Sequence, residues 1–366
     1  MIHFVYALPT SPTVAGRIRQ RAILAAQRAG VPVSYAGPRD RVNTASWPTR
    51  APTSITANVY RALFARADTR LYDVREHALI RGGPDDVLVG HYLAGDAGGV
   101  WQRSCRDGRF ALRVAMNPLH HHMTDVCAEL DPYVPMVDRI FGIMGPYWYD
   151  TWRQSALAHW FPKIVPLDMA IDIDAYPRLK RSFNPPGRRR FLYIGWAGAQ
   201  KGTHLLSILF GLAKPHRCIA VGPATPVPNV ECRPRVRFTP SYLQRLAEEC
   251  DFLLVPGVSD ANPTVVLEAM AWGLPVACTP QSGYYNIPEL LPLSITDMRH
   301  NLAMLDRLQE ADERDLLARA DAARTLVATR YTWGRFVDTL CFALNAAMIE
   351  KGLPPLCGDV AQPAGR

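Results

Sequence analysis

The sequence predicts an α/β protein that contains two doubly wound parallel sheets facing one another. Short apolar runs alternate with amphipathic, helix-like segments almost throughout, which is the pattern of a parallel sheet covered by helices. A basic stretch broken by Pro-Pro-Gly, Arg178–Arg190, interrupts the alternation, which then restarts. The length of 366 residues exceeds one typical compact core and suits two domains. Sheets of this kind bind ligands at the carboxyl ends of their strands.

The first domain is expected over residues 1–177. Gly16–Ala29 is a helix candidate after the first strand. Six apolar runs indicate strands: Ile2–Ala7, Val31–Tyr35, Asp86–His91, Ala111–Met116, Arg139–Met144 and Lys163–Leu167.

A linker over residues 178–190 is expected to lead into a second domain over residues 191–330. Four strands are predicted there: Phe191–Gly195, Cys218–Gly222, Asp251–Pro256 and Pro275–Thr279. Helices are predicted over His204–Ala213, Ser241–Glu249, Pro263–Trp272, Glu310–Thr329 and Thr332–Met348. Residues 331–351 are expected to form a helix that crosses back to the first domain, followed by a Pro/Gly-rich tail, 352–366.

Composition and charge narrow the class of protein. Hydrophobic residues make up 48% and charged residues 20%, as in a soluble globular protein. The net charge of +8 favours phosphate-bearing ligands or an anionic membrane surface, although a solvated basic surface explains it equally well. No nucleic-acid-binding motif accompanies the charge, so we expect no nucleic-acid partner.

Cysteine usage and the N-terminus point to the cytoplasm. None of the eight cysteines forms a C-x-x-C pair and several lie in apolar runs, which indicates reduced, buried thiols and argues against a zinc site. The N-terminus lacks the pattern of a signal peptide, and no apolar run reaches the roughly 20 residues of a membrane helix.

The strongest local signal is the stretch Ser259–Gly283. Asn262 suits an N-cap and Pro263 the first helical position, while Gly273 suits the end of the helix. The free amides near Thr264 and Val265, together with the helix dipole, would form an anion site.

Two carboxylates flank this helix start. Glu268 lies one turn beyond Thr264 on the same face, where it can accept hydrogen bonds from the vicinal hydroxyls of a ribose. Asp260 precedes the helix and can point at the group beyond a bound diphosphate. On these grounds alone, a plain βαβ unit with no ligand is the favoured interpretation, because capped helices are common.

This stretch resembles the Glu-x7-Glu region of retaining family-4 glycosyltransferases (glycosyl transferases group 1), which have the GT-B fold of two Rossmann-like domains. The pattern E-x-x-P-x-V-V-L-E-A-M-A-x-G-x-P-V is matched at Pro263, Val265–Ala271, Gly273, Pro275 and Val276. The first acid is Asp260 instead of Glu, and this shorter side chain leaves its role open.

The resemblance extends to other segments. Tyr193–Gly202 resembles the strand–loop that ends in Lys-Gly, which implies that Gly195 and Lys201 bind the donor diphosphate. The Arg of the family's pattern is replaced by Trp196. Gly16 occupies the place of the family's glycine-rich loop after the first strand. Pro166–Asp172, ending near Tyr176, resembles the I-P-N-G-V-D-x-x-x-F segment. Tyr331–Trp333 resembles the segment that precedes the last helix.

Histidines supply further candidates. In the resembled family a histidine near the end of the fourth predicted strand lies beside the donor sugar, and His120 or Asn117 could take that position. His91 could line the acceptor side, or be a structural histidine. Asp172-Ile173-Asp174 is an unsuitable metal-binding DXD motif because it precedes the linker, and the family generally needs no metal.

The resemblance implies a retaining, metal-independent glycosyltransferase that uses a nucleotide-diphosphate sugar, UDP- or GDP-linked, and no cofactor. Asp260, His120 and Lys201 would be catalytic, and Asn262, Pro263, Thr264, Val265 and Glu268 would bind the donor. The acceptor would be a saccharide or a lipid-linked saccharide of bacterial surface-polysaccharide assembly. The aromatic and arginine residues of the first domain, such as Trp101, Arg103, Trp148, Trp152 and Trp160, suit a lipid-linked acceptor at the inner face of the membrane, and core aromatics with scattered surface arginines explain them equally well. A nucleotide-sugar epimerase or synthase of the same fold, and an inactive nucleotide-sugar-binding protein, are the alternatives.

Overall fold

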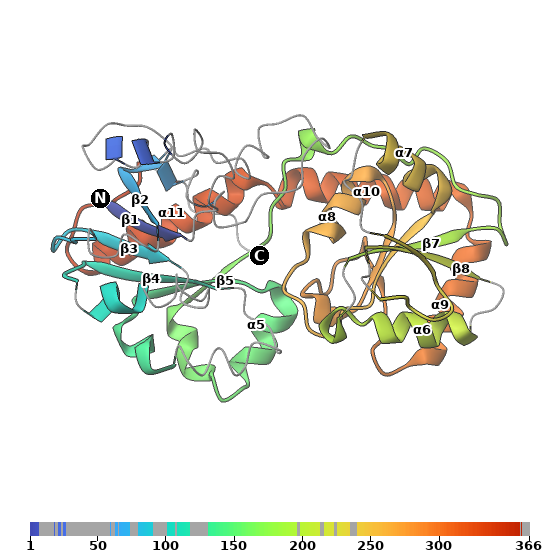
Figure 1. Cartoon of the computed structure of the whole chain (residues 1–366), viewed down its shortest axis with the longest axis horizontal. Helices are drawn as coiled ribbons and strands as arrows, with labels where there is room; N and C mark the ends of the chain where they lie inside the picture. The colour runs from blue at the N-terminus through green and yellow to red at the C-terminus, as the bar shows by residue number, and fades with distance from the viewer. Residues whose placement is uncertain are drawn as a thin grey trace.

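The structure is a computed structural model with two parallel sheets at opposite ends of the molecule (Figure 1). It describes residues 1–6, 18, 21–22, 25–26, 59, 63–64, 66–73, 80–90, 101–106, 108–117, 131–195, 198–212, 216–222, 225–234, 240–358 and 360. The predicted strand Val31–Tyr35 and most of the predicted helix Gly16–Ala29 lie outside these residues.

The first sheet has six parallel strands in the order β2-β1-β3-β4-β5-β6. The strands are β1 (Ile2–Tyr6), β2 (Thr69–Asp73), β3 (Val87–Gly90), β4 (Leu112–Asn117), β5 (Arg139–Ile143) and β6 (Ile164–Leu167). Strand β3 and most of β5 are buried, as expected for parallel strands covered on both faces. The helical elements after β4 are η4 (Asp131–Met136), α5 (Gly145–Arg153) and η5 (Ala158–Lys163).

The second sheet is also parallel, with the order β12-β11-β10-β7-β8-β9. The strands are β7 (Arg190–Ile194), β8 (Arg217–Val221), β9 (Glu231–Arg233), β10 (Phe252–Val255), β11 (Val276–Cys278) and β12 (Leu291–Pro292). The helical elements among and after them are η7 (Ala199–Lys201), α6 (Thr203–Leu212), α7 (Pro240–Glu249), α8 (Thr264–Trp272), η8 (Pro280–Ser282), α9 (Met298–Glu310) and α10 (Glu313–Arg330).

The predicted elements within the described residues are confirmed to within a few residues. The strands β2, β9 and β12, the helices α5 and α9 and the 3-10 helices were not predicted from the sequence. The long helix predicted from Glu310 begins later, at Glu313, because Asp312 accepts a hydrogen bond from the Arg314 amide (2.7 Å) and caps α10 after a break. The preceding residues form α9, which is capped by Asp297.

The segment before β7 packs against the second sheet. The ammonium of Lys180 lies 2.9 Å from a carboxylate oxygen of Asp251, and both side chains are buried. The guanidinium of Arg189 donates to the carbonyls of Leu308 and Ala311 at the end of α9. Residues 178–190 are therefore anchored to the second sheet at these points, and the domain boundaries proposed from the sequence stay a prediction.

The last helix, α11 (Trp333–Glu350), packs against the first sheet (Figure 1). Lys351, just after its end, lies 2.6 Å from a carboxylate oxygen of Asp138. Ile171 pairs with Thr332 in a parallel bridge, so the two chain segments that connect the lobes run side by side. The chain thus passes from the first sheet to the second and returns, as predicted for the GT-B fold.

Candidate active site

The topology of the second sheet marks one position for a ligand. The strand order reverses between β7 and β10, which are neighbours in the sheet although β8 and β9 lie between them in sequence. In open α/β sheets, ligands bind outside the carboxyl ends of the strands at such a switch point. The loops that follow β7 and β10 contain Lys201 and Asp260, respectively.

The side chains of Lys201 and Asp260 form an ion pair. The ammonium nitrogen of Lys201 lies 2.5 Å from Oδ2 of Asp260, and the side chains are 23% and 13% exposed. This partial burial makes the attraction stronger than in a fully hydrated surface pair. Burial and the charge of Asp260 both raise the pKa of Tyr193, at the end of β7.

Backbone contacts hold the two loops together. The amides of Val258 and Ser259 donate to the carbonyl of Gln200 at 3.0 and 3.2 Å. Gly202 ends η7 with a φ of +68°, and a Cβ on it would overlap the carbonyl oxygen of Pro256. Only glycine fits this approach, which explains the Lys-Gly sequence beside the ion pair.

Helix α8 begins one residue later than predicted. Its N-cap is Pro263, so the assignment of Asn262 as N-cap and Pro263 as first helical residue is wrong. Asn262 instead has a left-handed backbone (φ +49°), and its amide donates to the carbonyl of Ser282. An asparagine tolerates this conformation better than most residues. Gly273 ends the helix in the left-handed region, as predicted.

The N-terminus of α8 retains the features of an anion site. The first amides of a helix have no intrahelical acceptor. In the described part of the chain, the amides of Thr264 and Val265 have no protein acceptor, and both residues are half-buried. Together with the helix dipole they favour an anionic group, and this tip follows directly on the Asp260 loop.

Glu268 is a half-buried carboxylate on the same helix. Its side chain accepts a hydrogen bond from the Tyr176 hydroxyl (3.1 Å) and one from Thr264. Burial raises the pKa of Glu268 to about 7, although the two hydrogen bonds lower it. The carboxylate therefore titrates near neutral pH, which is a frequent property of functional groups.

The first lobe reaches the Asp260 loop through α5. The indole nitrogen of Trp148 donates to the backbone carbonyls of Asp260 (2.6 Å) and Gln281 (3.1 Å). The side chain of Gln281 also donates to the Tyr147 hydroxyl at 3.0 Å. Figure 1 shows α5 on the side of the first lobe that faces the second. This contact was not predicted, because nothing in the local sequence distinguishes Trp148 from a core tryptophan.

Five of the sequence-predicted positions add little to the geometry of the site. Gly16, His91 and His120 lie outside the described residues, and their roles stay predictions. The backbone of Asn117 ends β4 opposite Gly142 of β5. Gly195 follows β7, and its amide donates to the carbonyl of Val221 (3.1 Å).

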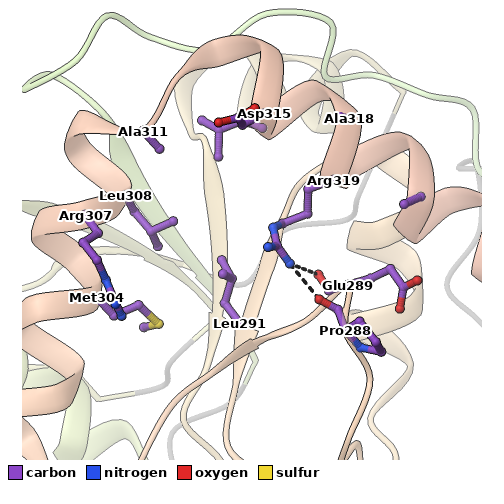
Figure 2. Close-up of a pocket in the computed structure, with 12 residues that line it drawn as sticks. Pro288, Glu289, Leu291, Met304, Arg307, Leu308, Ala311, Asp315, Ala318 and Arg319 are labelled. Atoms are coloured by element: carbon purple, nitrogen blue, oxygen red, sulfur yellow. Dashed lines mark hydrogen bonds between the residues drawn. The ribbon is translucent and has the colours of Figure 1, made fainter.

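A cavity of about 730 Å³ lies elsewhere in the second lobe, between α9, α10 and the segment at β12 (Figure 2). Arg319 crosses one side of it and donates to the carbonyls of Pro288 and Glu289 (Figure 2). The cavity shares no lining residue with the predicted site. The charged side chains of Lys201 and Asp260 lie together at the switch point instead. The size of this cavity therefore does not identify the site.

No group of three or more His, Cys, Asp or Glu side chains among the described residues is arranged to hold a metal ion. Within the same residues, no helix is both long and apolar enough to cross a membrane.

Two doubly wound parallel sheets, with the last helix packed back on the first, define the GT-B class. Three solved structures share this fold. Sucrose-phosphate synthase from Thermosynechococcus elongatus has a TM-score of 0.60 and 14% identity, over 96% of this chain and 99% of that chain. HepE from Anabaena, solved with UDP and glucose, has a TM-score of 0.51 and 12% identity, over 94% and 98%. TarM of S. aureus has a TM-score of 0.54 and 11% identity over 79% of this chain, which spans only 58% of TarM.

The sequence supports a narrower assignment for one part of the chain. Residues 188–297 match the family model of glycosyl transferases group 1, and this segment contains Lys201, Asp260 and Glu268. This part of the chain is therefore a glycosyl transferases group 1 domain. A comparison with curated protein sequences finds no match.

Proposed function

We propose that the chain transfers a sugar, with retention of anomeric configuration, from a nucleotide-diphosphate sugar to an acceptor. One observation supports this proposal above others. Lys201, Asp260 and the N-terminus of α8 converge at the switch point of the second sheet, inside the segment that matches the glycosyltransferase family.

The ion pair suggests how the donor enters. Asp260 neutralises Lys201 in the structure, and a donor diphosphate would compete for the same ammonium group. Once Lys201 binds the diphosphate, Asp260 is released to accept hydrogen bonds from hydroxyls of the transferred sugar. A positively charged group at the departing diphosphate is what the reaction requires, because negative charge develops there in the transition state.

The other donor contacts follow the geometry of α8. The amides of Thr264 and Val265 would bind phosphate oxygens, and Glu268 would accept hydrogen bonds from the ribose hydroxyls. Asn262 and Pro263 would shape the turn before them. His120 or Asn117 would contact the sugar from the first lobe, and Gly16 and His91 would line that side.

UDP-sugars are the first donors to test, since HepE and TarM have been solved with UDP. A saccharide or lipid-linked acceptor is part of the proposal. Peripheral contact with an anionic membrane is also proposed, from the net charge of +8 alone, because the tryptophans that suggested it (Trp101, Trp148, Trp152 and Trp160) are buried in the first lobe. Binding to vesicles of anionic lipid at low salt, lost at moderate salt, would support that contact, and no binding at low salt would refute it.

The experiment is a thermal-shift screen of UDP-, GDP-, ADP- and CMP-sugars. We expect one donor class to stabilise the protein, by about 2.7 kcal/mol at 100 times its Kd. Saccharide acceptors are then added, and NMR of the product determines the anomeric configuration. An epimerase would convert the donor without acceptor, and a protein that binds donor without any turnover would be an inactive binder. Either result would refute the proposed transfer.

A further inference from the structure

Tyr176 joins the segment between the lobes to the carboxylate on α8. It follows the short helix η6 (Ile173–Ala175), and its side chain is only 8% exposed. The hydroxyl donates to Oε1 of Glu268 at 3.1 Å, across 92 residues of sequence. The resembled family pattern has Phe at this place, so the hydroxyl is a feature of this chain.

The backbone of Tyr176 is fixed against the helix that carries Glu268. Arg324 of α10 donates to the carbonyl of Tyr176 at 2.7 Å and also to the carbonyl of Ala271 on α8. The amide of Tyr176 donates to the carbonyl of Ile173, and Asp172 caps η6. These contacts fix the backbone of Tyr176 and its ring is buried in the core, so its hydroxyl can define the position of a carboxylate oxygen.

We propose that Tyr176 is a positioning residue for nucleoside recognition, which orients Glu268 to accept both ribose hydroxyls of the donor. The inference rests on the proposed function and adds one residue to it. A carboxylate offers about four acceptor positions. Tyr176 and Thr264 use part of this capacity on the protein side, and the rest is available to a vicinal diol.

The protonation state of Glu268 bears on the same role. Only the ionised carboxylate acts purely as a hydrogen-bond acceptor. Burial opposes ionisation of Glu268 and raises its pKa to about 7. Tyr176 donates to Glu268 and so lowers that pKa. Arg324 of α10 is the charged group that contacts both Tyr176 and α8, and Arg178 and Asp174 act in turn on Arg324. Their charges are shared by any Tyr176 variant, so a shift on losing the hydroxyl reports the hydrogen bond itself.

The test uses Y176F, which keeps the buried ring and removes only the hydroxyl. Binding of UDP and of 2′-deoxy-UDP is measured by calorimetry for the wild type, Y176F, E268Q and the double variant, from pH 6 to pH 9. We expect Y176F to weaken UDP binding about tenfold at pH 7. We expect Y176F to have a much smaller effect on the affinity for 2′-deoxy-UDP. Adding Y176F to E268Q should not weaken UDP binding further. In Y176F, the midpoint of the curve of UDP affinity against pH should move to higher pH. Y242F, on α7, is the control tyrosine and should bind UDP as the wild type does.

Several results would overturn the proposal. An equal loss of affinity for UDP and 2′-deoxy-UDP in Y176F would mean that Tyr176 acts directly on the ligand or only on the fold. A loss in Y176F that adds to the loss in E268Q would mean the same. A Y176F variant that binds UDP as the wild type does would also overturn it, with the proposed function intact. A wild type that binds none of UDP, GDP, ADP and CDP would refute the proposed function itself. Thermal unfolding of each variant confirms that it is folded.

Discussion

Glu268 is a residue whose surroundings oppose its charge. Its pKa is raised from 4.5 to about 7, and burial is the cause. The folded protein therefore binds this proton more tightly than the unfolded chain does. Protonated Glu268 therefore contributes stability that is fully present below about pH 4.5 and is lost as the pH rises to about 7. Functional sites often carry such a cost in stability.

We predict that E268Q removes this pH dependence. The glutamine has no charge to desolvate, so the melting temperature of E268Q relative to the wild type should rise between about pH 4.5 and pH 7 and stay constant above. Binding of the nucleoside diphosphate should weaken in the same variant. Thermal unfolding from pH 4.5 to pH 8.5 measures the first effect. A constant difference over that range would show that Glu268 has an ordinary pKa.

Some residues of this site could be predicted from the sequence and others could not. Asp260 and Glu268 became candidates because proline, asparagine and glycine mark the helix beside them, and Lys201 was implied by the resemblance to the family's strand–loop that ends in Lys-Gly. Tyr176 and Trp148 touch Glu268 and the Asp260 backbone across 92 and 112 residues, and no local pattern reports such contacts. The error at Asn262 has a similar origin, because its backbone is set by Ser282 and the neighbouring loop.

At the scale of elements, the turn between η7 and α6 depends on one glycine. The positive φ of Gly202 and its close approach to Pro256 leave no room for a side chain. We predict that G202A lowers the free energy of unfolding by about 3 kcal/mol and displaces Lys201. G187A is the matched control, since Gly187 has a φ of +74° with no atom near the added Cβ. It should cost about 1 kcal/mol in chemical denaturation. Equal losses in the two variants would contradict the packing described here.

Helix α5 is the element of the first lobe that holds the Asp260 loop. We predict that W148F, which loses the two indole hydrogen bonds, lowers kcat/KM about tenfold through misplacement of Asp260. Its cost in stability should be about 1 kcal/mol. W152F, on the same helix but packed within the first lobe, should lose stability and keep kcat/KM. Loss of activity in W152F to the same extent would argue against a specific role for Trp148.

Elements were predicted where local signals were strong. The strands β1, β3, β7 and β10 are apolar, and α8 has a proline before it and a glycine after it. The missed strands β9 and β12 have three and two residues, and β2 has a polar sequence, TRLYD. Pairing with a neighbouring strand decides such segments, and a single sequence does not show that pairing.

At the scale of the whole molecule, both sheets carry loops at the carboxyl ends of their strands, and the lobes meet at α5. Under the proposed function, Lys201 and the tip of α8 would supply the positive charge needed for the departing diphosphate. We therefore predict that transfer continues in excess EDTA. The measurement is nucleoside diphosphate release with and without EDTA, with added Mg²⁺ as the reference. Loss of activity in EDTA that Mg²⁺ restores would contradict this part of the account.

The central claim is that a diphosphate binds between Lys201 and the N-terminus of α8, and calorimetry with K201A tests it most directly. The wild type should bind a nucleoside diphosphate about tenfold more tightly than the matching monophosphate, because Lys201 makes charge-assisted contacts to the outer phosphate. K201A should lose that preference, and R188A, at an exposed arginine before β7, should keep it. A K201A variant that retains the full preference for the diphosphate would contradict the account.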